Sequence, residues 1–576
     1  MKVKKILKYC RDMPPCLSNP IIKMLFFFQT LKILIYLSVV ILLSGSLFSL
    51  GIPKIGNIKI IGNSGDISVR FYLKNVLDEA VGLKVKYRCG GSDNNWYDAA
   101  IVVSGKLKSG KENFFTWESY QDEMEEVSEE YILKLIPYCG DKSGESIESG
   151  KFKIDNRTVS FADTNLEAVI RKIINRPKKE IYRTDLIGIE EIVAEDMGIE
   201  GSIKGIEYCI DLKRIRFARN WISDISDLRE LTKLEYIDFD SNYISDLSPV
   251  SNLKILKKLD ISHNNIKHIE SLKNLTNLTL LDISSNMIKE ISALSSMKKL
   301  TEINISFNEV SDYGAIACMK QLKSLSMGAN PGTDISSIFQ LKYIETLDLS
   351  MLKLDRFTFT DEFPTITSLN IKFNNLKEIK GITKFLNLEK LDISYNSICD
   401  ISDLRNLKKL ECLLISSNMI KDISPVSDLV MLQKLDLSSN PISDSDLTSV
   451  KKLINLRSLD CSSTGRISID SFSNLKNLEE LYTYSNKIIN ISSLKTLKNL
   501  RSIYMHNNEI IDISSLSKMR KLKIIVAEYN KIRDLSPLQN HFSNSKGMLK
   551  IEGNPLTPSS LKMLDDFQKK EIIVYK

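Results

Sequence analysis

The sequence predicts an α/β horseshoe solenoid, with a parallel β-sheet on the concave side and short helical or 3₁₀ returns on the convex side, preceded by an all-β sandwich domain. Asparagine recurs at intervals of 22 residues through most of the chain, which indicates stacked structural repeats. Apolar residues alternate just before each asparagine, as in a short strand. Residues 56–156 instead hold short alternating runs between polar turns, which is the pattern of a small antiparallel sandwich.

Composition places the chain among ordered proteins with a mixed surface. It has 576 residues, 43% of them hydrophobic and 26% charged, enough for a large core and more than one domain. The 79 basic and 72 acidic residues give a net charge of +7, to which the first 32 residues contribute seven basic side chains. Nucleic-acid binding needs a basic stripe rather than this mixture, so we expect no nucleic-acid partner.

The nine cysteines occur without a CxxC pair or regular spacing, which predicts neither a zinc site nor a dense disulfide framework. We expect most of them to be buried free thiols. Cys89 and Cys139 both fall in the sandwich, but they should end two antiparallel strands at opposite poles. That separation exceeds the ~7 Å that a disulfide tolerates between Cα atoms, so we expect no bridge between them.

Residues 1–55 are predicted to direct the chain to a membrane. A basic start is followed by residues 33–52, which carry no charge, and the positive-inside rule sends everything after Gly51 across the membrane. Small residues at positions 44–46 are typical of a signal-peptide cleavage zone, but the uncharged stretch is also long enough for an uncleaved anchor. Both outcomes stay open. We expect an extracellular or cell-surface protein that contacts the membrane through residues 33–52 if they are retained.

Residues 56–156 are predicted to form the sandwich. Runs such as ISVRFYL, LKVKYRC and NFFTWES alternate, and Trp96 and Trp117 are candidates for core or edge packing. The strings KVKYRCGGSDNNWYDA, FFTWES, YILKLIPYCGD and FKIDN resemble fibronectin type III or immunoglobulin-like modules of bacterial surface proteins. The resemblance implies a spacer that holds the rest of the chain off the membrane. Direct ligand binding is the alternative, because fold alone carries no function.

Residues 206–556 are predicted to form about sixteen repeats of the pattern L-x-x-L-x-L-x-x-N-x-I, which is typical of leucine-rich repeats. Strand residues such as Leu259 and Ile261 should point inward, and the asparagine should bond backbone groups that the following turn leaves unpaired. Leu352 and Thr464 interrupt the row. The framework asparagines are Asn220, Asn242, Asn264, Asn286, Asn308, Asn330, Asn374, Asn396, Asn418, Asn440, Asn486, Asn508, Asn530 and Asn554.

Two polar rows after the asparagine predict the return of each repeat. An acidic residue stands four positions on and a serine six positions on, as in Asp246 and Ser248, and Pro249 follows. A serine hydroxyl that caps free amides, with proline in the first position, would start a short helical turn. Sixteen such coils stacked at ~4.7 Å would give a sheet roughly 75 Å long.

Both ends of the array are predicted to be capped, by a helical segment at residues 157–205 and by a helix and strand at residues 557–576. Asp163 or Thr164 should cap the first helix. Its apolar positions, expected to face the first coil, are Leu166, Val169, Ile170 and Ile173.

The 22-residue spacing, the D-I-S-P-L type of return and the segment VSFADTNLEAVIRKIINRP resemble the repeats and cap of internalin-type bacterial surface proteins. The resemblance covers about residues 160–554 and implies an adhesin or recognition role. Partner contacts vary among such proteins, so the resemblance transfers the framework and no contact residue. Nothing after Pro558 resembles a wall-sorting motif, which departs from wall-anchored members.

Strand positions two and four residues before each asparagine are predicted to line the concave face, where a protein or a glycan would bind. The face divides into a basic start, a middle of aspartate and serine, and an aromatic end. The candidate partner-binding residues are Arg214, Arg216 and Arg219 at the start and Tyr482, Tyr484, Tyr504, His506 and Tyr529 at the end. Tyrosines in register on an exposed sheet are typical contact hot spots; the alternative is stacking that only stabilises the sheet.

Aspartates in the middle of the face, about 5 Å apart, would repel by roughly 0.8 kcal/mol per pair in a water-like dielectric. A calcium ion could relieve this repulsion, but such hard cations need six or more oxygens from several directions. Hydrogen bonds to the neighbouring serines are the simpler account. We therefore predict no metal and no cofactor.

Sequence motifs give no support to an enzyme. The chain has four histidines and lacks a nucleophile elbow, a phosphate loop or a metal-spaced cluster. His263 and His268 share one repeat but should lie on different faces. We therefore predict non-enzymatic binding of a macromolecular partner. The alternatives are an envelope scaffold without a specific ligand and, more remotely, a hydrolase whose site escapes motif analysis.

Overall fold

The computed structural model describes residues 53–575, apart from residues 62–65, 75–80, 90–94, 104–105, 109, 120–129, 155–156, 178, 360, 443–445, 466, 540, 542–546 and 570–571. The predicted targeting stretch, residues 33–52, lies outside this range. Within the range, no helix is both long and apolar enough to cross a bilayer. The described residues form two compact units, the first within Met1–Ser160 and Ile174–Ile187 and the second within Phe161–Ile173 and Gly188–Lys576.

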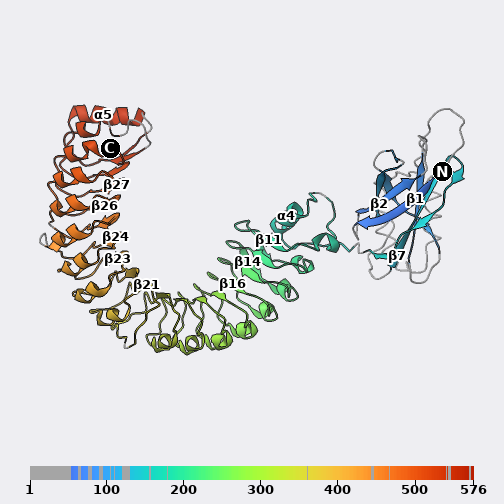
Figure 1. The fold of residues 1–576 in the computed structure, drawn as a ribbon, viewed down its shortest axis with the longest axis horizontal. Coiled ribbons are helices and arrows are strands. Elements are labelled where there is room, and N and C mark those ends of the chain that lie inside the picture. The colour runs from blue at the N-terminus through green and yellow to red at the C-terminus, as the bar shows by residue number, and fades with distance from the viewer. Residues whose placement is uncertain are drawn as a thin grey trace. The chain divides into compact units, whose positions relative to one another are not determined.

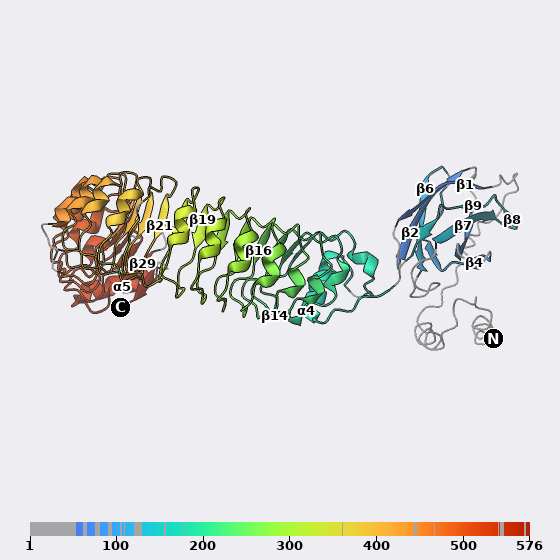
Figure 2. The ribbon, with the colours of Figure 1, turned by 90° about the horizontal axis from the view of Figure 1, so that it is seen from below.

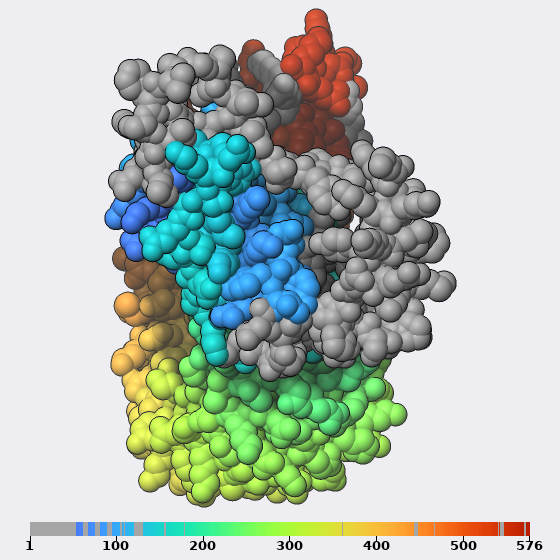
Figure 3. Space-filling model, turned by 90° about the vertical axis from the view of Figure 1, so that its right-hand side faces the viewer, coloured from blue at the N-terminus to red at the C-terminus, as the bar shows by residue number. Residues whose placement is uncertain are grey.

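The first unit contains two antiparallel sheets around one core, as the sequence predicts (Figure 1). One sheet has the strand order β1-β2-β6-β5 and the other β10-β7-β3-β4, with β8 and β9 also paired to β7. The strands are β1 Lys54–Ile61, β2 Asp66–Lys74, β3 Gly82–Cys89, β4 Tyr97–Asp98, β5 Ile101–Val103, β6 Glu112–Glu118, β7 Glu130–Cys139, β8 Lys142–Ser143, β9 Ile147–Glu148 and β10 Phe152–Lys153. Figure 3 shows one side of this unit, coloured blue to cyan.

Strand β1 was not among the predicted strands. Its pairing with β2 shifts register between Gly56 and Lys59, and Asn57 adopts a left-handed φ of 52°. This irregularity breaks the alternation that reveals the other strands. The sequence-based pattern therefore missed a strand at the edge of the first sheet.

The core of the sandwich follows from the alternation of its strands. Val69 and Phe71 of β2, Trp117 of β6 and Leu133 of β7 are fully buried between the two sheets. Trp96, the other candidate core aromatic, is only partly buried. The side chains of an arginine and a lysine lie over its ring at 4.9 Å each, so it packs at the surface.

The second unit is the predicted solenoid. Among the described residues, eighteen strands form one parallel sheet, because β11 Glu191–Val193 and β30 Ile573–Tyr575 extend the sixteen repeat strands at the two ends. The repeat strands are β13 Arg214–Arg216, β15 Tyr236–Asp238, β16 Lys258–Asp260, β17 Leu280–Asp282, β18 Glu302–Asn304, β19 Ser324–Ser326, β20 Thr346–Asp348, β21 Ser368–Asn370, β22 Lys390–Asp392, β23 Cys412–Leu414, β24 Lys434–Asp436, β25 Ser458–Asp460, β26 Glu480–Tyr482, β27 Ser502–Tyr504, β28 Ile524–Val526 and β29 Met548–Lys550. Within this unit they line the inner side of an arc (Figure 1), and Figure 2 shows the outer side with its short helices.

Each repeat strand buries its middle residue and pairs one repeat at a time with its neighbours. Leu259 lies opposite Ile237 on one side and Leu281 on the other. The same apolar position thus stacks on itself along the whole array. Full burial of one such side chain contributes about 1.5–3 kcal/mol, so the apolar core of the solenoid is the sum of many equivalent layers.

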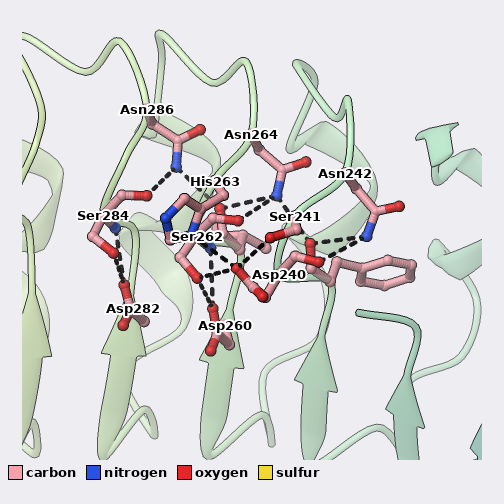
Figure 4. A network of polar contacts seen from close by, with 12 residues as sticks. Asp240, Ser241, Asn242, Asp260, Ser262, His263, Asn264, Asp282, Ser284 and Asn286 are labelled. Carbon is pink, nitrogen blue, oxygen red and sulfur yellow. Dashed lines mark hydrogen bonds and ion pairs between the residues drawn. The ribbon is translucent and has the colours of Figure 1, made fainter. Parts of the chain in front are cut away.

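The asparagine of each repeat bonds backbone groups of two coils (Figure 4). Asn264 donates through Nδ2 to the carbonyls of Ile261 and Ser262 in its own coil, at 3.1 and 2.9 Å, and to Phe239 of the preceding coil at 2.9 Å. Its Oδ1 accepts the amide of Ile244, also in the preceding coil, at 2.9 Å. Equivalent bonds recur at the other framework positions, for example at Asn418. This confirms the predicted role and adds that half of these bonds join neighbouring coils.

The two interruptions of the asparagine row are accommodated differently. Thr464 donates through Oγ1 to the carbonyl of Cys461 at 2.9 Å, which replaces one of the asparagine bonds. The side chain of Leu352 has no polar atom that could replace the asparagine bonds. In the described residues no 3₁₀ helix lies between β20 and β21, and a cluster of aromatic rings fills this return, formed by Phe339, Phe357, Phe359, Phe363 and Phe385.

The convex returns are 3₁₀ helices, as predicted, but in eight of the described ones an aspartate rather than the serine caps the start. Asp246 accepts the amide of Ser248 at 2.8 Å, and the Ser248 hydroxyl donates to the same carboxylate at 2.7 Å. The serine hydroxyl therefore orients the carboxylate, and the carboxylate satisfies the free amide. The helices are η3 Ile206–Tyr208, η4 Ser226–Leu228, η5 Ser248–Val250, η6 Glu270–Asn274, η7 Ser292–Ser296, η8 Gly314–Cys318, η9 Ser336–Gln340, η10 Lys380–Lys384, η11 Ser402–Asn406, η12 Ser424–Asp428, η13 Asp446–Lys452, η14 Asp470–Asn474, η15 Ser492–Thr496, η16 Ser514–Lys518 and η17 Ser536–Leu538.

Helices stand at both ends of the array. Helix α4, Thr164–Ile173, begins after Asp163, which accepts the amide of Leu166 at 2.8 Å. Three of its four predicted apolar contacts are buried, but Ile173 at the last turn is 43% exposed, because the helix ends there. At the other end, helix α5, Pro558–Lys569, precedes β30, which pairs with β29. The remaining elements are η2 Arg183–Leu186 and a small parallel pair, β12 Glu200–Ser202 with β14 Trp221–Asp224.

The residue before each framework asparagine, and before Leu352 and Thr464 where they interrupt the row, adopts a left-handed backbone conformation. We call these positions the pre-asparagine row. Their φ values lie between 51° and 59° for fifteen non-glycine residues, from Arg219 to Tyr529. Their amides continue the ladder between coils, as when Phe373 donates to the carbonyl of Ser394 at 3.0 Å. A left-handed conformation costs a residue with a Cβ roughly 1–2 kcal/mol, and bulky residues rarely adopt it.

Replacing Asn264 with alanine should destabilise the array by more than about 2 kcal/mol, because several buried backbone groups lose their partner at once. The neighbouring exposed Asn265 provides the matched control, since its replacement with alanine should change stability by less than about 0.5 kcal/mol. Urea unfolding of the two variants measures the difference. Equal effects at the two positions would show that the Asn264 bonds do not hold the coils.

The cysteines are less uniformly buried than predicted. Of those whose side chains are described, Cys139, Cys209 and Cys461 are buried free thiols, Cys412 is intermediate, and Cys318 and Cys399 are exposed. The exposed pair lies on the outer part of the repeat, at the end of η8 and in the turn after an asparagine. Strand register confirms that Cys89 and Cys139 lie at opposite ends of the β3–β7 pair.

Thiol reactivity should follow this burial. Burial, helped by the nearby Glu207 carboxylate, raises the pKa of the Cys209 thiol to about 12, which removes the reactive thiolate at neutral pH. We expect maleimide to label Cys318 and Cys399 in the native protein and Cys209 only after denaturation. Peptide mass spectrometry identifies the labelled positions. Rapid native labelling of Cys209 would contradict the fold at the first repeats.

Candidate binding surface

The concave face is built from the residues that flank the buried middle of each strand. Alternation turns the positions four and six before the asparagine outward, and in β16 these are Asp260 and Lys258. The sequence-based prediction included the first of these rows and missed the second, which is the more exposed. The face is therefore two strand rows wide, bordered by the pre-asparagine row.

The predicted row of serines two before the asparagine also faces this side, but it is nearly buried. Ser262 and Ser284 are each 5% exposed. Ser262 donates its hydroxyl to Asp260 at 2.6 Å and its amide to the same carboxylate at 3.0 Å, and Ser284 treats Asp282 in the same way (Figure 4). The serines serve as partners for the aspartates, as predicted, rather than as contact surface.

Burial on the sheet makes the aspartates of this face weaker acids. It raises the pKa of Asp260 to about 6, against the opposing effect of the Ser262 bonds, and it raises the pKa of Asp238 and Asp460 as well. Asparagine replaces aspartate at two positions of this row, and one of them, Asn304, donates to Asp282 at 3.0 Å. Among the described residues, no group of three or more histidine, cysteine, aspartate or glutamate side chains could hold a metal ion.

Replacing Asp260 with asparagine should stabilise the protein above pH 6. Because its folded pKa lies above the unfolded value of about 3.9, the ionised carboxylate destabilises the folded state at pH 7 and ceases to do so as the pH falls towards 4. The amide keeps the acceptor for Ser262. We expect a gain of a few degrees in midpoint temperature at pH 7.5, shrinking by pH 4.

Asp246, which caps a return, should respond with the opposite sign. Its bonds to the Ser248 amide and hydroxyl lower its pKa, so its ionised form contributes stability above pH 4 that is lost at lower pH. Asp246→Asn should therefore lower the midpoint at pH 7.5. Thermal unfolding followed by circular dichroism compares the two variants. A change of the midpoint temperature in the same direction for both would refute the assignment of Asp260 as partly desolvated.

The basic start of the face is partly neutralised. Arg216 lies 2.6 Å from the carboxylate of Glu195, and Arg219 lies 3.4 Å from its other oxygen. Arg214 is exposed at the outer edge of the strand. The structure thus joins Arg216 and Arg219 through Glu195, which sequence analysis missed because this residue belongs to the cap rather than to the repeat pattern.

The aromatic end consists of two stacks on adjacent strands. The rings of Tyr482 and Tyr504 lie 4.6 Å apart and are inclined by 7°, and the rings of Tyr484 and His506 have the same separation and inclination. All four side chains are half-buried, with one side available to solvent. Tyr529 lies in the pre-asparagine row and is 56% exposed.

One member of each stack is held uncharged at neutral pH. Burial, the Glu480 carboxylate and the neighbouring ring raise the pKa of Tyr482 to about 12, and burial lowers the pKa of His506. The stacks therefore offer apolar ring area with polar tips that can donate and accept hydrogen bonds. This chemistry suits a macromolecular contact rather than a charged small ligand.

Two further groups of exposed aromatics were missed by the sequence-based prediction. Phe373 and Tyr395 stack at 4.2 Å in the pre-asparagine row. Trp221 and Tyr243, each 56% exposed, follow their asparagines and line a pocket of about 440 Å³ beside Glu200. Both rows lie outside the strand alternation from which the prediction was made. Tabulating the positions just before and after each asparagine would have revealed them.

Comparison with known proteins agrees with the repeat architecture. Family profiles for leucine-rich repeats match residues 232–288, 256–310, 429–450 and 498–540. No curated protein matches the sequence.

Several solved structures are similar to the chain. An internalin from Listeria monocytogenes is 26% identical, covering 67% of this chain and 94% of its own, with a TM-score of 0.39. A leucine-rich repeat protein of Leptospira interrogans is 18% identical, covering 68% and 97%, with a TM-score of 0.49. Internalin C2 from Listeria monocytogenes is 24% identical, covering 44% and 94%, with a TM-score of 0.32. The repeat pattern, the profile matches and the solenoid sheet together identify the chain as a leucine-rich repeat protein, similar to internalins at low sequence identity.

Proposed function

We propose that the protein is an exported, non-enzymatic recognition protein that binds a macromolecular partner through the concave face of its solenoid. The observation that carries this proposal is the pair of half-exposed aromatic stacks, Tyr482 with Tyr504 and Tyr484 with His506. Leucine-rich repeat proteins use such faces to bind proteins and peptides. The partner is a protein in this proposal, with a glycan as the alternative.

Stacking within the sheet does not remove these rings from a partner's reach. A stack fixes each ring in one orientation before binding, so little side-chain freedom is lost when a partner covers it. Tyrosine is also enriched among the residues that carry most of the energy at protein interfaces. The stack therefore serves stability and recognition together, and the binding role predicts what a purely stabilising role does not: dependence of capture on the ring.

The N-terminal stretches and the sandwich have roles of their own in this function. The basic and uncharged stretches at the N-terminus support export, with residues 33–52 removed or kept as an anchor. The strand order of the sandwich matches the immunoglobulin-type arrangement, in which A-B-E-D and C-F-G strands form the two sheets. We propose that this module is fibronectin III-like or immunoglobulin-like and acts as a spacer that holds the rest of the chain off the membrane.

Substitution of Tyr482 and Tyr504 tests the function. Immobilised full-length protein should capture a protein partner from biotinylated secreted and surface proteins, and Tyr482→Ala with Tyr504→Ala should weaken this capture at least tenfold, which corresponds to about 1.4 kcal/mol. The double Tyr→Phe variant is the control, because it keeps the stack and removes only the hydroxyls. Surface plasmon resonance with the identified partner gives the affinities.

The alternatives make different predictions. An envelope scaffold without a specific ligand should capture nothing selectively, and a glycan ligand should compete as a free oligosaccharide. Full capture by the alanine variant would discard the aromatic end as the contact. Turnover of peptide, ester or glycan panels by the purified protein would reopen the hydrolase class.

A further inference from the structure

A second row of exposed apolar side chains borders the middle of the concave face. Phe307, Met351, Phe373 and Tyr395 occupy the pre-asparagine row, with Ala329 between the first two. Their exposed fractions lie between 42% and 55%. We call these residues the rim ridge. Single exposed apolar residues need no explanation, but a contiguous row on neighbouring coils usually marks an interaction site.

Folding gives no reason for these residue types. Every residue of the ridge is held in the left-handed backbone region, with φ between 54° and 59°. Elsewhere serine is the commonest residue of this row, at Ser241, Ser285, Ser417, Ser439, Ser463 and Ser485, and the other non-glycine positions hold Arg219, His263, Asn507 and Tyr529. A bulky side chain here adds backbone strain without being buried. The residues are therefore better explained by what they contact outside the molecule.

The ridge is also rigid and well placed. Each of its amides bonds the next coil, so the row is part of the ladder between repeats. Phe373 and Tyr395 stack with centroids 4.2 Å apart and planes inclined by 15°. The same position is occupied in Figure 4 by His263, whose ring reaches Asp240 at the top of the strands. The ridge thus runs along the rim of the concave face, beside the strand row that contains the aspartates.

The strand row beside the ridge contains acidic side chains and, over the second to the twelfth repeat, no basic side chain. From the second to the twelfth repeat, the position four before the asparagine holds Asp238, Asp260, Asp282, Asp348, Asp392, Asp436 and Asp460, and otherwise asparagine, serine or leucine. Basic residues stand at a few positions of the adjoining rows, such as Lys258 and Lys372. On the coils of the ridge this row holds Asp348 and Asp392, and Asp282 lies one coil before it, so a partner along the rim meets apolar side chains on one side and these carboxylates on the other.

The chain itself shows how a cation fits between them. The Lys372 ammonium lies 6.0 Å from the centre of the Phe373 ring and 3.9 Å from the carboxylate of Asp392. Asp348 shares a coil with Met351, and Asp282 lies on the coil before Phe307, so a lysine or arginine of a partner could lie against the ridge and reach a carboxylate at these two places.

We infer that the rim ridge and the adjoining aspartates bind a basic polypeptide segment that carries apolar side chains. The inference rests on the proposed function, since it names the class of partner that the concave face takes. The apolar side chains of the segment cover the ridge, and its lysine or arginine side chains face the carboxylates. Charge sets the orientation and the rate of association, and the rings supply the affinity.

Three synthetic peptides test the inference with the full-length protein. The first is a soluble lysine-rich peptide with two phenylalanines, the second replaces its lysines with glutamates, and the third replaces its phenylalanines with serines. We expect the first to bind at least tenfold more tightly than either of the others by fluorescence anisotropy. Its affinity should fall as salt is raised, because exposed charge pairs are screened.

Two variants locate the binding. Phe373→Ser with Tyr395→Ser should weaken binding of the first peptide at least tenfold, and it should fold normally because serine is the commonest native residue of this row. Tyr343→Ser is the matched control, because Tyr343 is 53% exposed and lies between η9 and β20, outside the concave rows. It should bind the peptide as the unmodified protein does. Circular dichroism and unfolding midpoints verify the fold of each variant.

The outcomes separate this inference from the proposed function. Loss of peptide binding in the Tyr482→Ala, Tyr504→Ala variant with no loss in the ridge variant would overturn the ridge and leave the concave-face function intact. Equal binding of the acidic peptide, or no binding of the basic one at millimolar concentration, would also overturn it. Self-association that the ridge variant abolishes would assign the surface to a second copy of this chain instead.

Discussion

Each framework asparagine uses one side-chain amide to satisfy backbone groups of two coils at once, and the geometry of the whole solenoid depends on this bond set. Asn264 joins the turn of its own coil to the backbone of the coil before it. Because the same bonds recur every repeat, neighbouring strands cannot slip by one residue without losing all of them. The register fixed at the turn is what brings Leu259 over Leu281 in the core and Tyr482 beside Tyr504 on the surface.

Because the framework residues hold the coils together, the residues of the outward rows are available for binding. The asparagine, the apolar strand positions and the capping aspartates are satisfied inside the coil, so the rows that face outward can vary without changing the fold. The chain uses that freedom unevenly. It places carboxylates in the middle of the concave face, stacked rings towards the end, and bulky side chains at left-handed positions of the rim where serine would fold as well.

The sequence predicted the solenoid well because its physics is periodic. The asparagine spacing, the alternating strand and the aspartate–serine bonds all follow from rules that repeat, and each is confirmed. What it missed is local. The cap of each return was assigned to Ser248 rather than Asp246, since either residue type can accept an amide and only geometry chooses between them. The aromatic filling beside Leu352 depends on contacts between distant residues, which no short pattern records. Glu195 joins the arginines through the fold of the cap, and the rim ridge lies outside strand alternation.

The most direct measurement is residue-resolved hydrogen exchange of the amides two positions after each asparagine. Ile244, Ile266 and Ile288 follow the turn and lie outside the sheet strands, yet each donates to the asparagine of the next coil. The asparagine column requires these amides to exchange as slowly as those of the central strand residues, because opening them means separating coils. Exchange as fast as that of exposed turn amides would show that the coils are held together by something else.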